Sequence, residues 1–171
     1  MLDTPRARTA QEMITAARQR FPTICAFGIL PYRIATRQDR LSFARQGFFG
    51  STISQPIDAD EVESAMLFLS MLTATKTGRV DSYLLKHASE SWCQRRGEAV
   101  RYISNGAMIT AAVALGLVTE ACGPAWADNP NVLIGVSERS VRRIMMVDAV
   151  ERRYRLRQAD PWTQTTQICA D

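Results

Sequence analysis

The chain has 171 residues and a net charge of +4, and 46% of its residues are hydrophobic while 22% are charged. A chain of this length buries roughly 70% of the surface that its unfolded form exposes, so one domain with a sizeable core is expected. The composition excludes a largely disordered protein. We expect a single globular domain over residues 1–158 and a flexible tail over residues 159–171.

The sequence carries no pattern typical of export, of membrane insertion or of metal binding. Its first residues lack the basic segment and apolar run of a secretory signal, and its apolar stretches end well before membrane-spanning length. The cysteines are far apart in the sequence, and their spacing indicates neither a zinc site nor a disulfide framework. We therefore expect a cytoplasmic protein with no membrane partner, no metal and no cofactor.

The first third of the chain predicts two helices and a strand. Thr9 and Glu12 have the spacing of a capping box, which predicts an amphipathic helix over residues 9–20. Residues 23–30 are apolar and rich in β-branched side chains, which predicts a short buried strand. A second helix is expected over residues 36–47.

A linker and a strongly apolar helix are expected next. Residues 48–57 contain glycine, proline and hydroxyl side chains, and they separate a possible N-terminal layer (residues 1–50) from a main body (residues 58–158). Acidic residues at the start of the following helix and Lys76 near its end match the helix macrodipole. Because this helix is apolar nearly all round, we expect it to be the buried centre of the fold.

The second half of the chain predicts alternating helices and strands. One helix starts at Asp81 or Ser82 and ends at Gly97, which is a typical C-terminal signal. The remaining expected elements are a strand over residues 100–103, a helix over 104–115, strands over 117–121 and 131–135, and a long last helix over 137–156. Helical patterns outnumber strand patterns, so we expect an α+β or α/β fold with five or six helices packed on a three- to four-stranded sheet.

His87 is the only histidine, and it lies one turn before Glu90 on the same expected helix. Residues three apart lie on one helix face, so this histidine and this carboxylate can meet as general acid–base catalysis requires. The apolar neighbours Leu84 and Ala88 favour a half-buried, hydrogen-bonded structural histidine instead. His87 and Glu90 are therefore the candidate catalytic residues of an alternative interpretation in which the protein is an enzyme acting on an anionic substrate.

Two helix starts offer candidate anion sites. Ser104, Asn105 and Gly106 lie where small residues leave backbone N–H groups accessible, and Ser137 begins the last helix in a similar way. Ordinary helix capping and close packing at Gly106 explain the same residues, since neither a glycine-rich loop nor a phosphate-binding lysine accompanies them.

Basic residues concentrate on the last expected helix. Residues 137–158 hold seven arginines against three acidic residues, a local charge of +4 that equals the charge of the whole chain. Helical periodicity brings five of these arginines onto one arc, which suits phosphates or an acidic protein surface. These are the candidate binding residues Arg139, Arg142, Arg143, Arg153 and Arg157. A solvated helix face is the alternative interpretation.

The start of this helix also resembles the recognition helix of a helix-turn-helix motif. In such a motif the preceding element is a helix. Here Pro130 interrupts the helical pattern and Val132, Leu133 and Ile134 favour a strand, so a helix-turn-helix is not the favoured interpretation.

Three stretches of the second half resemble a known group of proteins. They are Ser82 to His87, Tyr102 to Gly106 with Ile109, Ala111 and Ala112 after it, and Asn131 to Ser140. Together they are similar to uncharacterised small proteobacterial proteins that are often encoded on plasmids or integrated mobile elements. The resemblance implies a setting in mobile-element biology, and it implies no catalytic or binding residue.

We expect a non-enzymatic accessory or regulatory factor of a mobile element. It would bind a macromolecule, either a nucleic acid or an acidic protein surface, through the basic C-terminal helix. The first alternative is an inhibitor or adaptor that targets a protein of host defence or DNA transfer, with the same helix or the Phe48–Phe49 loop as its interface. The enzyme based on His87 and Glu90 is the second alternative.

Overall fold

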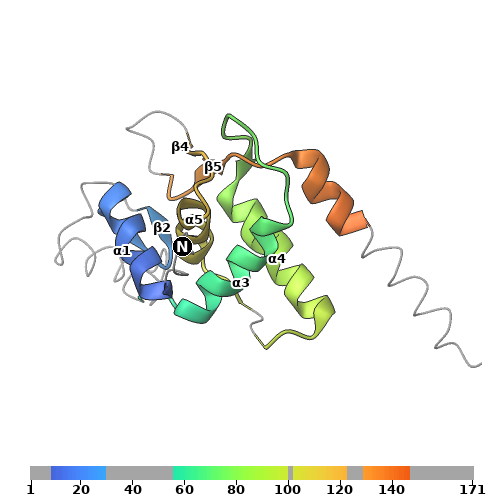
Figure 1. The fold of residues 1–171 in the computed structure, drawn as a ribbon, viewed down its shortest axis with the longest axis horizontal. Helices are drawn as coiled ribbons and strands as arrows, with labels where there is room; N and C mark the ends of the chain where they lie inside the picture. The colour runs from blue at the N-terminus through green and yellow to red at the C-terminus, as the bar shows by residue number, and fades with distance from the viewer. Residues whose placement is uncertain (1–8, 30–55, 100–101, 123–128, 147–171) are drawn as a thin grey trace, which may run out of the picture.

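Helix α5 (Asn105–Ala114) forms the centre of the fold in the computed structural model, which describes residues 9–29, 56–99, 102–122 and 129–146. The helix contacts α1, α3 and α4 and strands of both sheets (Figure 1). Residues 105–112 are all buried, and most of them are small or apolar. Small side chains allow neighbouring helices to approach from every side, so this helix becomes the central one.

The prediction that the helix beginning near residue 58 is the buried centre is therefore wrong. That helix, α3 (Ala59–Ser70), buries Val62, Ala65, Phe68 and Leu69 but leaves Leu67 51% exposed. Its start is as expected, because the Asp58 carboxylate accepts hydrogen bonds from the N–H groups of the first turn.

Helix α3 ends before Lys76 because the following residues pair with another segment. The Thr75 N–H donates to the Gly135 carbonyl at 2.9 Å, and the Ser137 N–H donates to the Thr73 carbonyl at 2.8 Å. Ala74 and Val136 form an isolated antiparallel bridge. These long-range hydrogen bonds replace the helical ones that the sequence pattern suggested.

Helix α1 (Ala10–Arg20) confirms the predicted capping box. The Thr9 side chain accepts from the Glu12 N–H, and the Glu12 carboxylate accepts from the Thr9 N–H at 2.7 Å. The apolar face of the helix, with Met13, Ile14 and Ala17, is buried against α5 and α3.

The expected single strand over residues 23–30 is instead a tight hairpin. Strands β1 (Ile24–Cys25) and β2 (Gly28–Ile29) pair antiparallel with each other. The chain reverses at residues 26–27, and Gly28, which follows this turn, has a φ of 129°, a conformation open to glycine and rarely to other residues.

Helix α4 (Ser82–Arg96) has the predicted ends. Asp81 caps its start, and Gly97 ends it in the left-handed conformation with a φ of 73°. The segment that follows was predicted to be a strand, but residues 102–103 form none. Within the described residues, the first strand of the predicted strand–helix–strand unit is therefore not formed, and residues 100–101 lie outside them.

The main sheet is antiparallel and has three short strands in the order β3, β5, β4. Strand β5 (Val132–Ile134) lies in the middle, between β3 (Val80–Asp81) and β4 (Thr119–Ala121). The described residues thus form an α+β fold, with five helical segments, this sheet and the β1–β2 hairpin, as the sequence predicted.

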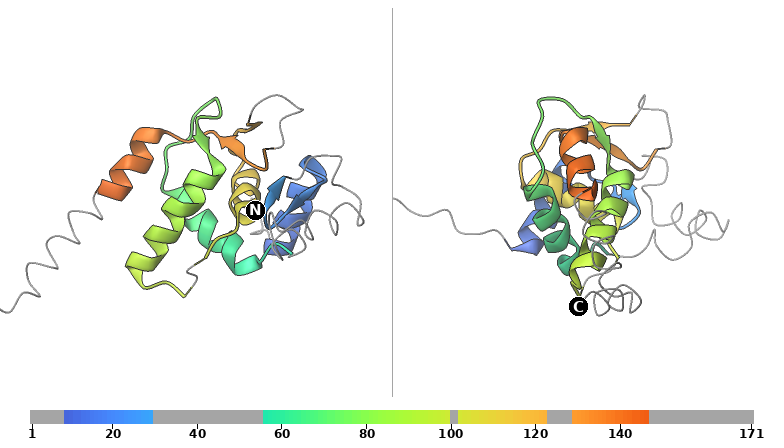
Figure 2. Two further views of the ribbon diagram at one scale, coloured as in Figure 1. Left: turned by 180° about the vertical axis from the view of Figure 1, so that it is seen from behind. Right: turned by 90° about the vertical axis from the view of Figure 1, so that its right-hand side faces the viewer.

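The last helical segment starts directly after Ser137 and covers residues 138–146 in the described part of the chain. It lies beside α4 and at the opposite end of the molecule from α1 (Figure 2). The rest of the predicted last helix, the predicted helix over residues 36–47, most of the linker and the C-terminal tail lie outside the described residues.

Candidate functional site

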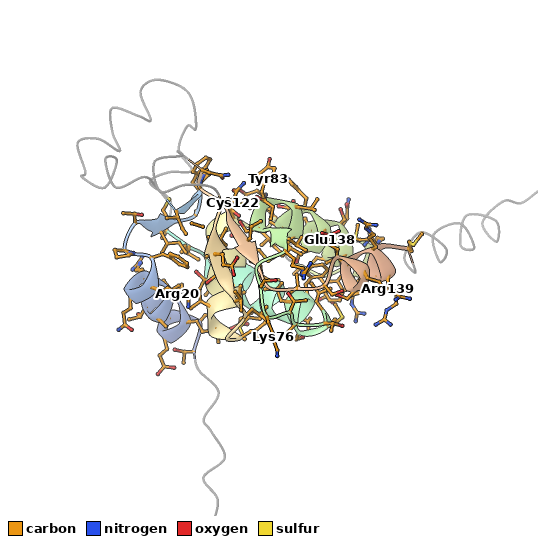
Figure 3. All side chains as sticks on the ribbon, turned by 90° about the horizontal axis from the view of Figure 1, so that it is seen from above. Arg20, Lys76, Tyr83, Cys122, Glu138 and Arg139 are labelled. Atoms are coloured by element: carbon orange, nitrogen blue, oxygen red, sulfur yellow. The ribbon has the colours of Figure 1, made fainter. Side chains whose placement is uncertain are left out.

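The described part of the basic helix presents its arginines to solvent. Arg139, Arg142 and Arg143 are all exposed, and Figure 3 shows Arg139 and Glu138 at the surface of residues 138–146. The Arg142 guanidinium pairs with the Glu138 carboxylate at 3.1 Å, and its side chain is 76% exposed. Arg153 and Arg157 lie outside the described residues.

The opposite face of this helix attaches it to the body of the protein. Val141 is buried, and the buried Ser140 hydroxyl donates to the Ser137 carbonyl at 2.7 Å and accepts from the Thr73 N–H at 3.2 Å. At the next turn the Arg95 guanidinium of α4 donates to the Met145 sulfur at 3.4 Å. The helix is thus held on one side while its arginines face outward.

Strand β5 precedes this helix, where a helix-turn-helix motif requires a helix. The acidic start of α3 is also engaged elsewhere. The Asp58 side chain caps α3, and the Glu61 carboxylate accepts from the Ser104 N–H at 2.8 Å. In the described residues the exposed arginines therefore do not pair with these two carboxylates.

A second group of polar side chains surrounds Glu90 on α4. One Glu90 carboxylate oxygen accepts from the Lys86 ammonium at 2.8 Å and from the Ile103 N–H at 3.1 Å. The other oxygen lies 2.8 Å from Nδ1 of His87, whose side chain is half exposed. The sequence predicted the contact between His87 and Glu90, and the structure brings these two candidate residues together. The Ile103 N–H also links the pair to the start of α5.

Lys86 is buried between two exposed tyrosines. Its side chain is only 7% exposed, and its ammonium lies 4.5 Å from the centre of the Tyr102 ring and 5.7 Å from the centre of the Tyr83 ring. The Tyr83 ring contacts the His87 ring edge-on at 4.5 Å. Sequence reasoning missed Lys86 and both tyrosines. The i,i+4 spacing of Lys86 and Glu90 indicates their ion pair. No local pattern places Tyr102 beside a lysine sixteen residues earlier.

The predicted anion site at Ser104, Asn105 and Gly106 is buried, and the Ser104 N–H, the Gly106 N–H and the Asn105 side-chain amide donate to groups within the protein. The Ala107 N–H donates to the Ser104 hydroxyl, as N-capping predicts, and the Gly106 N–H donates to the Ala26 carbonyl at 3.0 Å. The Asn105 amide group donates to the Phe27 and Pro130 carbonyls and to the Asn131 side chain. These contacts fit helix capping and packing, and a bound anion stays a prediction.

The thiol of Cys122 lies at the end of β4, close to the cap of α4. Burial and a hydrogen bond to the Asp81 carboxylate, at 3.3 Å, raise the pKa of this thiol to about 11. The thiol is therefore protonated near neutral pH, whereas a nucleophilic cysteine needs its thiolate form.

Comparison with protein-family models, with curated proteins and with solved structures gives no match to this chain. Across the described ranges, no helix has both the length and the apolar character needed to cross a membrane. The described residues also bring together no group of three histidine, cysteine, aspartate or glutamate side chains that could hold a metal ion.

Proposed function

We propose that this protein is a non-enzymatic accessory or regulatory factor that binds nucleic acid through the basic helix that begins at residue 138. The observation that carries this proposal is the outward face of that helix, where Arg139, Arg142 and Arg143 are exposed on an element held by Ser140 and Val141. The resemblance to proteins of mobile elements supplies the biological setting of the proposal.

Electrostatics favours phosphate groups as the contact. Arginine keeps its charge at every physiological pH, and its planar guanidinium matches the geometry of phosphate oxygens. The Arg142 ion pair with Glu138 is exposed and contributes little, so a phosphate can compete for this side chain. The described arginines lie on the surface of a helix that is not part of a helix-turn-helix motif. We therefore expect binding that depends on salt and only weakly on sequence.

The test is fluorescence anisotropy with labelled duplex DNA, single-stranded DNA and RNA at several salt concentrations. The variant Arg139→Gln/Arg142→Gln/Arg143→Gln removes three potential phosphate contacts. We expect binding to weaken roughly 100-fold at about 0.1 M salt, and the slope of log K against log salt to fall in magnitude by about 3.

A matched control separates local contacts from overall charge. The variant Gln11→Glu/Arg18→Gln/Gln19→Glu changes three exposed residues of α1 and lowers the net charge from +4 to +1, as the arginine variant does. Because α1 lies at the far end of the molecule (Figure 1), this control should bind nearly as well as the wild type. Equal losses in both variants would contradict a specific role of the basic helix. Failure of the wild type to bind any of these nucleic acids at low salt would leave an acidic protein surface as the target.

A further inference from the structure

The arrangement of Tyr83, Lys86 and Tyr102 reverses the usual exposure of these residue types. The lysine is buried, whereas both tyrosines are 52% exposed. Lysine side chains normally keep their charged ends in water, and tyrosine rings are usually more buried than lysines. Leu84, which follows Tyr83 on α4, is also exposed.

Side chains of α4 contact both tyrosine rings. Glu90 fixes the Lys86 ammonium and also accepts from the Ile103 N–H, which directly follows Tyr102. The ammonium then contacts both rings, and the Tyr83 ring also contacts the His87 ring. Because these contacts restrain the rings, a ligand that stacks on them loses less conformational entropy on binding than it would on unrestrained rings.

From this arrangement we propose that Tyr83 and Tyr102 form a stacking surface for unpaired bases of single-stranded nucleic acid. This proposal rests on the proposed function and names the form of nucleic acid that the protein prefers. Every base has a flat π face, and stacking on an exposed aromatic ring is a sequence-tolerant way to bind it. In a duplex these faces are covered by neighbouring base pairs, so an exposed ring discriminates between the two forms.

The ion pair between the two rings is compatible with this ligand. Lys86 and Glu90 neutralise each other, so the surface has no unpaired carboxylate from this pair to repel phosphates. Helix α4 also connects the stacking surface to the basic helix, since Arg95 near its end contacts Met145. Tyr83 and Arg95 are twelve residues apart, about 18 Å along the helix axis, a distance that one bound strand can span.

The experiment compares three labelled oligomers of equal length: oligothymidylate, an abasic strand with the same phosphates, and a duplex. The test variant is Tyr83→Leu/Tyr102→Leu, which removes the rings but keeps apolar side chains. Its matched control is Tyr83→Phe/Tyr102→Phe, which keeps the rings and removes only the hydroxyl groups. Circular dichroism and thermal unfolding of each variant establish that the fold is retained.

We expect the leucine variant to bind oligothymidylate about tenfold more weakly than the wild type, and to bind the abasic strand and the duplex as the wild type does. The phenylalanine variant should retain wild-type affinity for all three oligomers. Equal affinity of the wild type for oligothymidylate and the abasic strand would overturn the stacking proposal, as would unchanged oligothymidylate binding by the leucine variant.

The same oligomers separate this proposal from the proposed function. Loss of the three arginines should weaken all three complexes together, whereas loss of the tyrosines should weaken only the complex with unpaired bases. If the arginine variant binds like the wild type and the leucine variant does not, the basic helix is not the contact and the stacking surface is. If the wild type binds none of the oligomers, both proposals are wrong.

Discussion

Lys86 shows how one residue can hold two distant parts of the chain in position. Its ammonium contacts Glu90 on its own helix and the ring of Tyr102 in the segment before α5. A lysine removed from water in this way depends on its carboxylate, because an unpaired buried charge is strongly destabilising. The reverse also holds for Glu90, whose other partners among the described residues are His87 and the Ile103 N–H.

A double-mutant cycle measures this coupling. Lys86→Met keeps the length of the side chain but removes its charge, and we expect it to lower the free energy of unfolding by about 2 kcal/mol, since Glu90 loses its ammonium partner. Adding Glu90→Gln removes the isolated charge and should restore part of the loss, by about 1 kcal/mol. Urea denaturation of the two single variants and the double variant gives the coupling energy, and strictly additive effects would show that the pair contributes nothing.

At this site the sequence predicts contacts between residues close in the chain, and it does not predict contacts between distant residues. The pair of His87 and Glu90 lies on one helix, so its spacing was sufficient to predict it. The position of Tyr102 depends on how the segment before α5 returns to α4, and a local pattern contains no information about that return. The proposed stacking surface therefore depends on the contact of Lys86 with both rings, which no local pattern contains.

At the scale of elements, the sequence predicts where helices start. It does not predict element ends that are set by contacts between segments remote in sequence. Thr9, Asp58, Asp81 and Ser104 each cap the helix that the sequence indicated, because an N-cap is a contact within a few residues. The end of α3 was misplaced because residues 73–75 pair with residues 135–137, which are remote in sequence. The sequence predicts one strand in place of the β1–β2 hairpin, because the four paired residues of the hairpin are too few to show a pattern.

The close approach of α5 to the β1–β2 hairpin leaves no room for a side chain at Gly106. A Cβ atom at this position would lie 1.9 Å from the Cys25 carbonyl oxygen, which is backbone and cannot rotate away. Replacing a helical glycine with alanine normally stabilises a helix by up to about 1 kcal/mol. Here we expect Gly106→Ala to lower the free energy of unfolding by more than about 3 kcal/mol, because the hairpin must move.

Gly97→Ala is the matched control for Gly106→Ala. Gly97 has a positive φ, yet a Cβ atom there would meet nothing within 4 Å. Its substitution should therefore cost only about 1 kcal/mol, from backbone strain alone. Chemical denaturation of both variants tests the difference, and a cost at Gly106 equal to or below that at Gly97 would contradict the close packing of α5 on the hairpin.

At the scale of the whole molecule, hydrogen bonds join the basic helix and the residues just before it to the loop after α3. Residues 73–75 pair with residues 135–137, and the Thr73 N–H also donates to the Ser140 hydroxyl inside the basic helix. The orientation of the exposed arginines thus depends on a loop that is more than sixty residues away in sequence, and charge composition alone could not reveal it.

This dependence predicts that nucleic-acid affinity falls when the helix is loosened but keeps all its arginines. Ser140→Ala leaves the Thr73 N–H without its acceptor, so we expect a loss of about 1 kcal/mol in the free energy of unfolding. Binding to duplex DNA should weaken about threefold, equivalent to about 0.7 kcal/mol, because the arginines are held less firmly. The slope of log K against log salt should not change, since the number of phosphate contacts is the same.

Ser70→Ala is the control for Ser140→Ala. In the described residues the exposed Ser70 hydroxyl donates to the Leu67 carbonyl of its own helix, so neither stability nor binding should change appreciably. Wild-type affinity in the Ser140 variant, measured at several salt concentrations, would mean that the arginines act as a mobile charged segment and not as a surface positioned by the fold.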